Sequence, residues 1–337
     1  QPQNTIGNIS DFRSIRFMRM FMTGFSSEVT VRFGALDLVR GEWRRYTNTL
    51  DFNDTNVADD NTVLDVLAVN IQENNERCAI NYLSPPGVRR EQLYNNNTII
   101  NQNEQSLSLR VSGSGLEPQD SRAVFKNVSI DMRQFKKLKM FLHAESLPGE
   151  IALQDNQMVG FIRFGNGFTQ NFYQIEIPLK VTPASSVTNS DCAPLSAEAV
   201  WPEANEIDLS LALLTKLKIL AMSIDPTTLP ADGIYYPDLD PNKPEGDGTN
   251  SLKLGIKGNP NFGLVRTLMV GVKNSDLAND IKGEVWFNEL RLADMDNHGG
   301  MAALLNVDTN LADFATISAS GRKSTIGFGA LEQGPNE

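Results

Sequence analysis

One strand-like stretch occurs twice in this chain. Residues 11–22 read DFRSIRFMRMFM and residues 131–142 read DMRQFKKLKMFL, with acidic, basic and apolar residues in the same order. In the second copy Leu138, Met140 and Leu142 alternate with basic and other residues, and the first copy alternates in the same way. A period of two residues is typical of a β-strand with one buried face. The repeat therefore predicts two related β-structures, each with its apolar face on a core.

Two further matches follow in the same order along the chain. VTVRFG at 29–34 matches GFIRFG at 160–165, and LAVNIQEN at 67–74 matches VWFNELRL at 285–292 more weakly. The loop between the first two matches is longer in the second copy, which a duplicated domain tolerates because loop-closure cost grows slowly with length. The Asp-x-Arg-x-aromatic start of the repeat also resembles galactose-binding-like jelly rolls. We predict a mainly β chain with tandem jelly-roll-like β-sandwich domains and one or two short helices.

The spacing of the repeats sets the predicted domain boundaries. Residues 1–82 carry too few strands for a whole sandwich, so they are predicted to be the C-terminal part of a first one. Pro85, Pro86 and Gly87 and the Asn run after them disfavour regular structure, so residues 83–104 are predicted to be a linker. Residues 105–297 are predicted to form the second sandwich. Because the chain begins with Gln and carries no signal peptide, we expect it to be a piece of a longer protein.

One helix is predicted inside the second sandwich. Leu209, Leu213, Leu217 and Leu220 are spaced to lie on one helix face, and Asp208 is the candidate N-cap. Such a helix is expected to cover one end of the core.

The C-terminal residues 298–337 have a different composition. They are rich in Ala, Gly, Ser and Thr, and from Met301 onward they predict two short strands around SGRKS. Small residues in alternating strands suit the wall of a β-barrel, and an edge hairpin would give the same letters. Both alternatives are open on the pattern alone.

Charge and cysteine content limit the classes of function. The net charge is −11 and the Lys and Arg residues are dispersed, which disfavours nucleic-acid binding because that needs clustered basic residues. The sequence contains no run of 18 apolar residues, so it predicts no transmembrane helix. Cys78 and Cys192 could form one disulfide or remain two free thiols.

The sequence contains no recognisable catalytic motif. His143 and His298 are the two histidines, and they lie in no zinc-binding or nucleophile pattern. His143 is expected to be a polar residue at a strand end. We therefore predict no catalytic residues and no enzyme activity.

One loop has the composition of a calcium site. The segment DLDPNKPEGDGTN at 238–250 offers hard oxygen donors, which Ca²⁺ prefers. The EF-hand pattern fails, because Lys243 replaces its glycine and Thr249 replaces its bidentate glutamate. A solvated turn-rich loop fits equally well, and no other cofactor is predicted. The candidate calcium ligands are Asp238, Asp240, Asn242 and Asp247.

Several longer segments together resemble one known family. They are RFMRMFMTGF, LVRGEWRRY, NYLSPPGVRRE, KKLKMFLHAE, WPEANEIDLSLALLTKLK, KGNPNFGLVRTLMVGVKN and GEVWFNELRLADMDNHGGMAALLNVDTNLADFATISASG. They cover most of the chain in order and are similar to the SprA (Sov) family of Bacteroidetes. That family forms the outer-membrane translocon of the type IX secretion system and is linked to gliding motility.

This resemblance implies a fragment of a giant outer-membrane β-barrel through which folded cargo is exported. Sandwich domains inserted between barrel strands would surround the pore, exposed to the cell surface or the periplasm. Residues 298–337 would then be barrel strands. The implied partners are secreted cargo proteins, a PorV-like outer-membrane protein and a periplasmic plug protein.

The alternative function is a carbohydrate-binding or adhesion module of a cell-surface protein. It follows from the jelly-roll resemblance, and it requires exposed aromatic rings beside polar groups. Trp43, Trp201 and Trp286 are the candidates, although Trp286 lies in an alternating strand and is expected in a core.

Overall fold

The computed structural model describes residues 22–31, 42–48, 50, 61–90, 92–95, 98–184, 187–188, 191–230, 232–237, 252–295 and 301–325. Two compact units divide the chain, residues 1–41 and residues 42–337. The described part of the first unit, residues 22–31, contains no helix or strand. The second unit is mainly antiparallel β-sheet, which confirms the predicted fold class.

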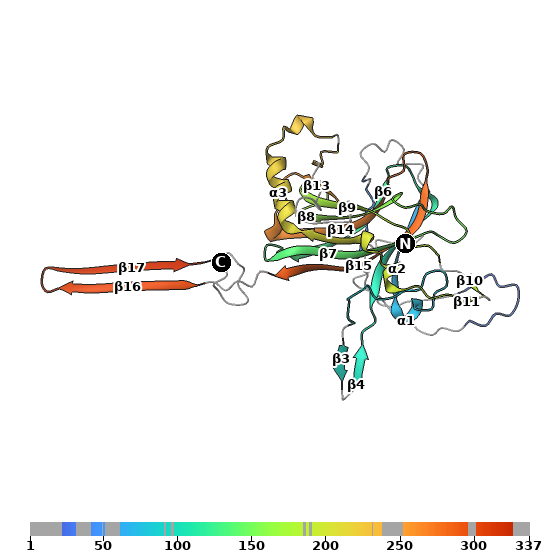
Figure 1. Cartoon of the computed structure of the whole chain (residues 1–337), viewed down its shortest axis with the longest axis horizontal. Coiled ribbons are helices and arrows are strands. Elements are labelled where there is room, and N and C mark those ends of the chain that lie inside the picture. The colour runs from blue at the N-terminus through green and yellow to red at the C-terminus, as the bar shows by residue number, and fades with distance from the viewer. Residues whose placement is uncertain are drawn as a thin grey trace. The chain divides into compact units, whose positions relative to one another are not determined.

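The second unit contains a six-stranded antiparallel sheet (Figure 1). Its strand order is β1-β6-β14-β8-β9-β13. The strands are β1 (Arg44–Arg45), β6 (Ser121–Ile130), β14 (Val265–Asn274), β8 (Met158–Gly165), β9 (Phe172–Pro178) and β13 (Lys253–Lys257).

A five-stranded antiparallel sheet packs on the six-stranded one. Its strand order is β12-β7-β15-β5-β2. The strands are β12 (Glu206–Ser210), β7 (Phe135–Glu145), β15 (Ile281–Met295), β5 (Gln105–Leu116) and β2 (Thr62–Asn70).

Aliphatic side chains from both sheets form the core between them, here called the first core. Met140 and Leu142 of β7 and Ile162 and Phe164 of β8 are almost fully buried in it. The first two matched segments of the second copy are thus strands β7 and β8, one in each sheet, and both put their apolar faces on the shared core, as predicted. A sandwich with this alternation is what two-residue periodicity specifies.

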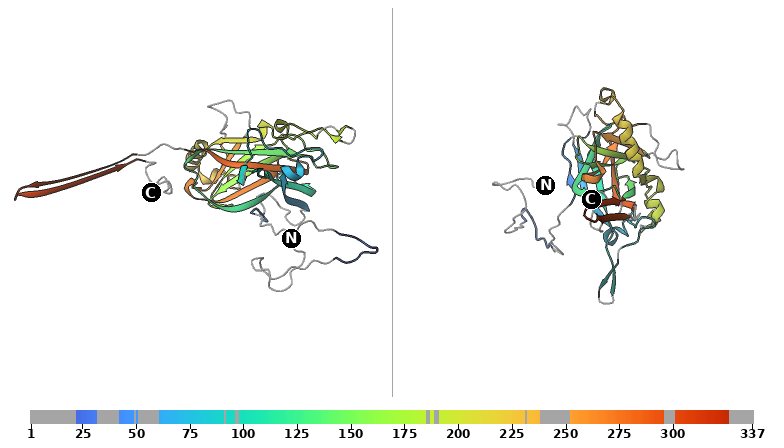
Figure 2. Two further views of the ribbon diagram at one scale, coloured as in Figure 1. Left: turned by 90° about the horizontal axis from the view of Figure 1, so that it is seen from below. Right: turned by 90° about the vertical axis from the view of Figure 1, so that its left-hand side faces the viewer.

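Helix α3 (Leu211–Met222) closes one side of the sandwich, as Figure 2 shows. It contacts the edge strands β12 and β13 of the two sheets. Its buried residues are Leu211, Leu214 and Leu217, and its N-cap is Ser210. The predicted N-cap Asp208 is wrong, because Asp208 pairs with Lys139 inside β12. The alternation of Ile207, Asp208 and Leu209 favoured a strand up to the start of the helix.

The remaining described elements are short helices and separate hairpins. The helices are α1 (Ile71–Asn74) and α2 (Ala197–Val200), with 3₁₀ turns η1 (Glu203–Asn205), η2 (Pro226–Thr228) and η3 (Phe262–Leu264). Three hairpins pair β3 (Gln92–Asn95) with β4 (Thr98–Asn101), β10 (Val187–Thr188) with β11 (Asp191–Cys192), and β16 (Ala302–Leu311) with β17 (Ala315–Ser324).

Strands from both sides of the predicted linker lie in one sheet. All nine residues of β2, which precedes the linker, pair with β5, which follows it. The predicted linker, residues 83–104, itself contains the hairpin β3–β4. The first copy of the repeat, residues 11–22, lies outside the described residues except for Met22, so the first sandwich stays a prediction.

Candidate functional site

The outer face of the five-stranded sheet carries a second core. His143 of β7 lies directly opposite Trp286 of β15, and Glu145 lies opposite Glu284. Two segments, residues 77–83 and 192–201, lie over these side chains and are here called the cover segments. The apolar members of the second core are Val69, Ile80, Tyr82, Phe141, Val200, Trp201 and Trp286. Strands β7 and β15 are therefore buried on both faces below the cover segments, and their alternating sequence did not predict this.

Trp286 lies at the centre of the second core with no exposed surface. The His143 ring stacks on it with a centroid distance of 4.0 Å, and the rings of Tyr82 and Trp201 lie 5.6 and 6.0 Å away. Trp201 also donates its indole N–H to the carbonyl oxygen of Leu83 at 2.7 Å. Trp286 is thus a core residue, as expected. Trp201 is packed in the same way.

His143 and Glu145 lie next to each other below the cover segments. Nδ1 of His143 lies 2.7 Å from the carbonyl oxygen of Val200, and a carbonyl can only accept, so Nδ1 carries a hydrogen. Nε2 lies 3.3 Å from Oε2 of Glu145. His143, expected at a strand end, is in fact fully buried with both nitrogens partnered.

Two buried carboxyl groups lie side by side in this core. Glu145 and Glu284 are each about 1% exposed and are direct cross-strand neighbours. Arg77 from a cover segment bonds to Glu145, and its Nη1 lies 3.9 Å from Oε1 of Glu284. Arg110 of β5 donates from Nε to Oε2 of Glu284 at 2.8 Å. Two guanidinium groups therefore balance two carboxylates, which is what makes such burial tolerable.

Glu284 is held in its charged form. Burial alone would raise its pKa, but side-chain hydrogen bonds from Trp286, Ser108 and Arg110 lower the pKa below its ordinary value, and the charge of Arg77 adds to this. The bonds from Ser108 Oγ and Trp286 Nε1 to Oε1 measure 2.7 and 2.8 Å. A carboxylate with three donors is a satisfied structural charge.

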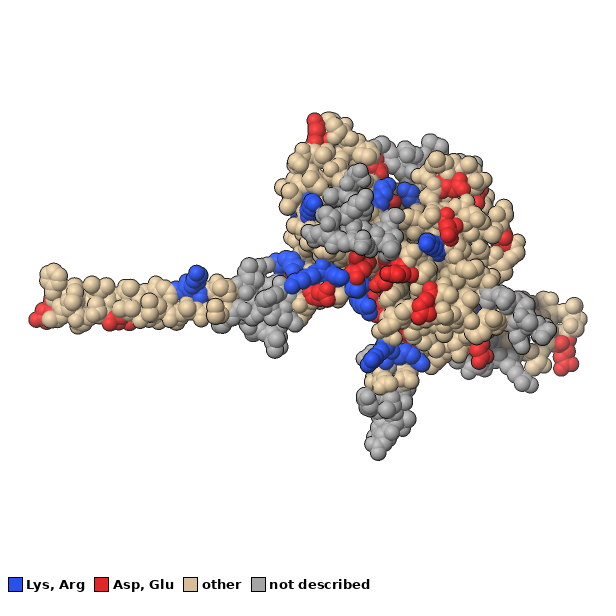
Figure 3. Space-filling view, viewed as in Figure 1, with Lys and Arg blue, Asp and Glu red and all other residues tan. Residues whose placement is uncertain are grey.

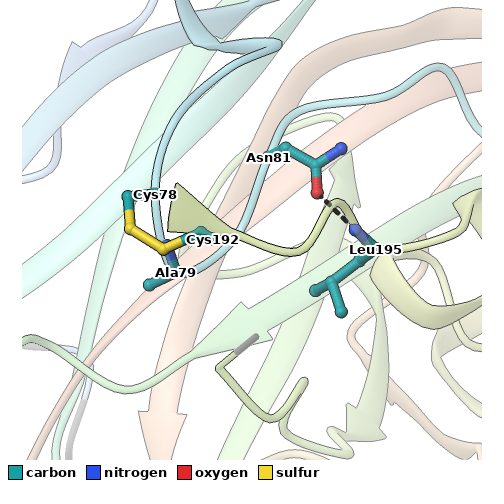
Figure 4. The surroundings of a disulfide bond; sticks show 5 residues. All are labelled: Cys78, Ala79, Asn81, Cys192 and Leu195. Atoms are coloured by element: carbon teal, nitrogen blue, oxygen red, sulfur yellow. Dashed lines mark hydrogen bonds between the residues drawn. A yellow bond between two sulfur atoms is a disulfide. The ribbon is translucent and has the colours of Figure 1, made fainter. Parts of the chain in front are cut away.

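A disulfide between Cys78 and Cys192 joins the two cover segments (Figure 4). Their Cα atoms are 5.3 Å apart, and the two cysteines are 114 residues apart in sequence. Nearby, the backbone N–H of Leu195 donates to Oδ1 of Asn81 at 2.8 Å. Of the two alternatives left open by the sequence, the structure gives the disulfide.

A cavity of about 570 Å³ opens beside this disulfide. Its wall includes Arg77, Cys78, Glu145 and Thr182 together with apolar residues of the loop 146–157 and of residues 181–184. The cavity thus brings a guanidinium, a carboxyl group and a disulfide to one surface. These groups can bind polar ligands or exchange with thiols, and they form no nucleophile–base pair of the kind that catalysis requires.

The outer face of the six-stranded sheet carries a smaller buried polar cluster. Arg163 lies on that face and is buried, and it donates to Oε1 of Gln174 and to the carbonyl oxygen of Phe168. Burial lowers the pKa of Arg163. Tyr236 donates to Glu176 at 2.8 Å and covers this cluster. All polar groups named here are partnered, so the cluster is structural.

The hairpin β16–β17 is a second candidate site. The two strands pair at ten successive positions, from Ala302 with Ser324 to Leu311 with Ala315. Every residue of the two strands is exposed except the half-buried Ala315. Few of its side chains are charged (Figure 3). An isolated two-stranded hairpin is at best marginally stable in water, so this hairpin needs contacts outside itself to be stable.

The two faces of this hairpin differ in chemistry. Alternation and register put mostly apolar or small residues on one face and mostly polar ones on the other. The apolar face holds Ala303, Leu305, Val307, Thr309, Leu311, Ala315, Ile317, Ala319, Gly321 and Lys323. The polar face holds Ala302, Leu304, Asn306, Asp308, Asn310, Thr316, Ser318, Ser320, Arg322 and Ser324.

The predicted calcium ligands Asp238, Asp240, Asn242 and Asp247 lie outside the described residues, as does His298. Within the described ranges no group of three His, Cys, Asp or Glu residues could hold a metal ion. The sequence did not indicate the second core. Its available signals were the polar residues at alternate positions of two otherwise apolar strands.

Comparison with protein families gives a match over the whole chain. The family model SprA_N, described as motility related/secretion protein, matches residues 1–337. A comparison with curated proteins gives no match. Among the helices of the described ranges, none has the length and apolar character needed to cross a membrane.

Proposed function

Because this chain belongs to the SprA family of motility-related and secretion proteins, we propose that it is part of the outer-membrane channel of a type IX secretion system. The sandwich acts as a scaffold around the pore through which folded cargo is exported. The hairpin β16–β17 supplies two strands of the barrel wall.

The observation that carries this proposal is the two-faced hairpin. Ten residues at ~3.4 Å each span ~34 Å. At a tilt of ~40° they rise ~26 Å, which matches the apolar band of an outer-membrane barrel. The apolar face, with Leu305, Val307 and Ile317, suits lipid, and the polar face, with Asn306, Asp308 and Ser318, suits a water-filled interior. A hairpin of a water-soluble sandwich would bury its apolar face on a core instead.

The disulfide supports a location in the cell envelope. Disulfides form and persist in the periplasm and at the cell surface and are rare in the cytosol. The Cys78–Cys192 bond joins segments that are also held by hydrogen bonds, so it belongs to the folded structure. The sandwich is therefore placed, in this proposal, at the periplasmic or the outer face of the outer membrane.

The proposed partners are secreted cargo proteins, a PorV-like outer-membrane protein and a periplasmic plug protein. The sandwich is proposed to have no enzyme activity, because its buried histidine and carboxyl groups are used in structural bonds. The alternative of a carbohydrate-binding module has less support. Trp201 and Trp286 are buried, and the half-buried ring of Trp43 has Lys126 Nζ at 4.9 Å from its centre.

The proposal can be tested by placing one charge on either face of the hairpin in the full-length protein in its own cells. Val307→Arg would put a guanidinium in lipid, at a cost of about 2–4 kcal/mol near the membrane centre. Asn306→Arg puts the same group one position away on the polar face. We expect Val307→Arg to lower barrel assembly and cargo export, and Asn306→Arg to leave assembly unchanged.

Assembly is measured by heat-modifiable mobility in outer-membrane fractions, and export by the cargo in the medium. Equal tolerance of both substitutions would contradict a lipid-facing hairpin. Equal loss with both would contradict the assignment of faces. Normal export with lost surface adhesion would favour the alternative function.

A further inference from the structure

The Cys78–Cys192 disulfide is accessible from solvent, unlike the second core that it adjoins. Cys78 is exposed and Cys192 is half-buried. Cys78 also lines the cavity of about 570 Å³, which gives an incoming molecule room to approach its sulfur. Exposed disulfides are the ones that exchange readily with thiols, whereas structural ones are usually shielded.

The two sulfur atoms have different surroundings. The backbone N–H of Ala79 points to Sγ of Cys192 at 3.3 Å. A hydrogen-bond donor stabilises a thiolate, so negative charge is better accommodated on Cys192 than on Cys78. Thiol–disulfide exchange proceeds fastest when the sulfur that leaves is the better-stabilised thiolate. The geometry therefore favours attack on Cys78 and departure of Cys192.

We propose that Cys78–Cys192 is a thiol–disulfide exchange site for a dithiol protein or a small thiol. A thiolate from the partner attacks Sγ of Cys78, a new S–S bond forms between them, and the electron pair of the old bond leaves on Cys192. A second thiolate, from the same dithiol protein or from another molecule of the small thiol, then attacks the partner's sulfur in this mixed disulfide, and the electron pair leaves on Cys78. The partner is oxidised by two electrons, and the two cysteines take up two protons as thiols.

Exchange at this site loosens the cover over the buried charges. The two cover segments are held together by the disulfide, by the Leu195–Asn81 bond and by the Trp201–Leu83 bond. Beneath them lie Glu145 and His143, whose buried polar groups would gain hydration if water entered. At the edge next to the cavity, the disulfide holds the two cover segments together and so keeps water out. Its reduction opens the cover there, while the first core stays closed.

The test uses the folded chain and glutathione as the thiol. The protein is exposed to reduced glutathione without denaturant, quenched with acid, alkylated with N-ethylmaleimide and mapped by peptide mass spectrometry. We expect about a threefold or larger excess of glutathione on Cys78 over Cys192. An equal or reversed distribution, or no reaction without denaturant, would overturn the proposal.

Hydrogen exchange tests the consequence for the cover. After reduction with dithiothreitol we expect faster amide exchange in residues 77–83 and 192–201, and no change in β8 and β14. The variant Cys78→Ser with Cys192→Ser is the control, since dithiothreitol should not alter its exchange. Unchanged amide exchange in the cover segments of the reduced protein would show that the disulfide does not keep these segments closed.

Discussion

The two cores lie on opposite faces of the same sheet and are built from opposite chemistry. On β7, Met140 and Leu142 face the first core, while His143 and Glu145 face the second. The first core is aliphatic apart from a few aromatic rings. The second joins aromatic rings to two carboxyl groups, two guanidinium groups and a disulfide.

The difference teaches how each core is stabilised. The first core gains free energy with buried apolar area, at about 25 cal/mol per Å². That gain does not depend on pH or on redox conditions. The second core buries charges, which costs free energy unless each charge keeps its partner. We therefore expect single partner deletions to be severe in the second core and mild changes of volume to be tolerated in the first.

The largest expected effect follows from removing Arg77. Arg77→Met leaves Glu145 buried without its guanidinium, and breaking such a pair costs about 3–5 kcal/mol. The control Ile162→Val, in the first core, is expected to cost about 0.5–1.5 kcal/mol. Urea unfolding of the 337-residue chain, followed by Trp fluorescence, measures both changes.

The double variant Arg77→Met with Glu145→Gln distinguishes a lost charge partner from lost packing. Because the second substitution removes the unpaired charge, we expect it to restore more than half of the stability lost in Arg77→Met. If the double variant is less stable than Arg77→Met, the two cores do not differ as described.

Much of the first core could be predicted from the sequence. The two-residue period around Lys139 and around Arg163 gave strands β7 and β8 with the right buried face, because apolar alternation has few other interpretations. The start of α3 was misplaced because Leu209 fits both a helical and an alternating pattern. The partner of β2 was not predicted, since strand pairing depends on contacts far apart in sequence.

The second core could not be predicted, because its parts carry no common pattern. Arg77, Glu145 and Glu284 come from a cover segment and two strands that are separated by long stretches of chain. The pairing of Cys78 with Cys192 likewise depends on the fold and not on spacing. Alternation predicted two strands around SGRKS, but the structure puts this segment, residues 320–324, inside β17 and the turn at residues 312–314. The sequence did not locate the turn, because the letters of SGRKS fit a turn as well as an alternating strand.

A pH titration sharpens the contrast between the cores. The folded-state pKa of Glu284 is lowered, so its stabilising effect is present above its unfolded pKa of about 4.3 and is lost as the pH falls through the folded value. The variant Glu284→Gln loses hydrogen bonds that charged and neutral donors make to the carboxylate. This loss lowers the free energy of unfolding by about 1.5–3 kcal/mol near pH 7. We expect the difference in unfolding free energy between wild type and variant to shrink as the pH falls below about 4.

Ile162→Val gives the reference for this titration. Its cost in the first core should be the same at every pH at which the protein is folded, because no charge is involved. A constant difference for Glu284→Gln as well would mean that Glu284 is not held as a carboxylate in the second core.

The smallest expected effect concerns the backbone next to the disulfide. Ala79 has φ of 73°, in the left-handed region, which costs a residue with a Cβ about 1–2 kcal/mol. Ala79→Gly relieves that cost but adds freedom to the unfolded chain, about 0.4–1 kcal/mol. We expect a net change between zero and a gain of about 1.6 kcal/mol. Ala144→Gly, at a fully buried position of the first core, should instead cost about 1–2 kcal/mol through lost apolar contact and added freedom. Thermal unfolding of both variants measures the two changes in stability. An equal loss of stability in the two variants would mean that the backbone at Ala79 carries no strain. The cover segments would then be no more constrained than a strand of the first core.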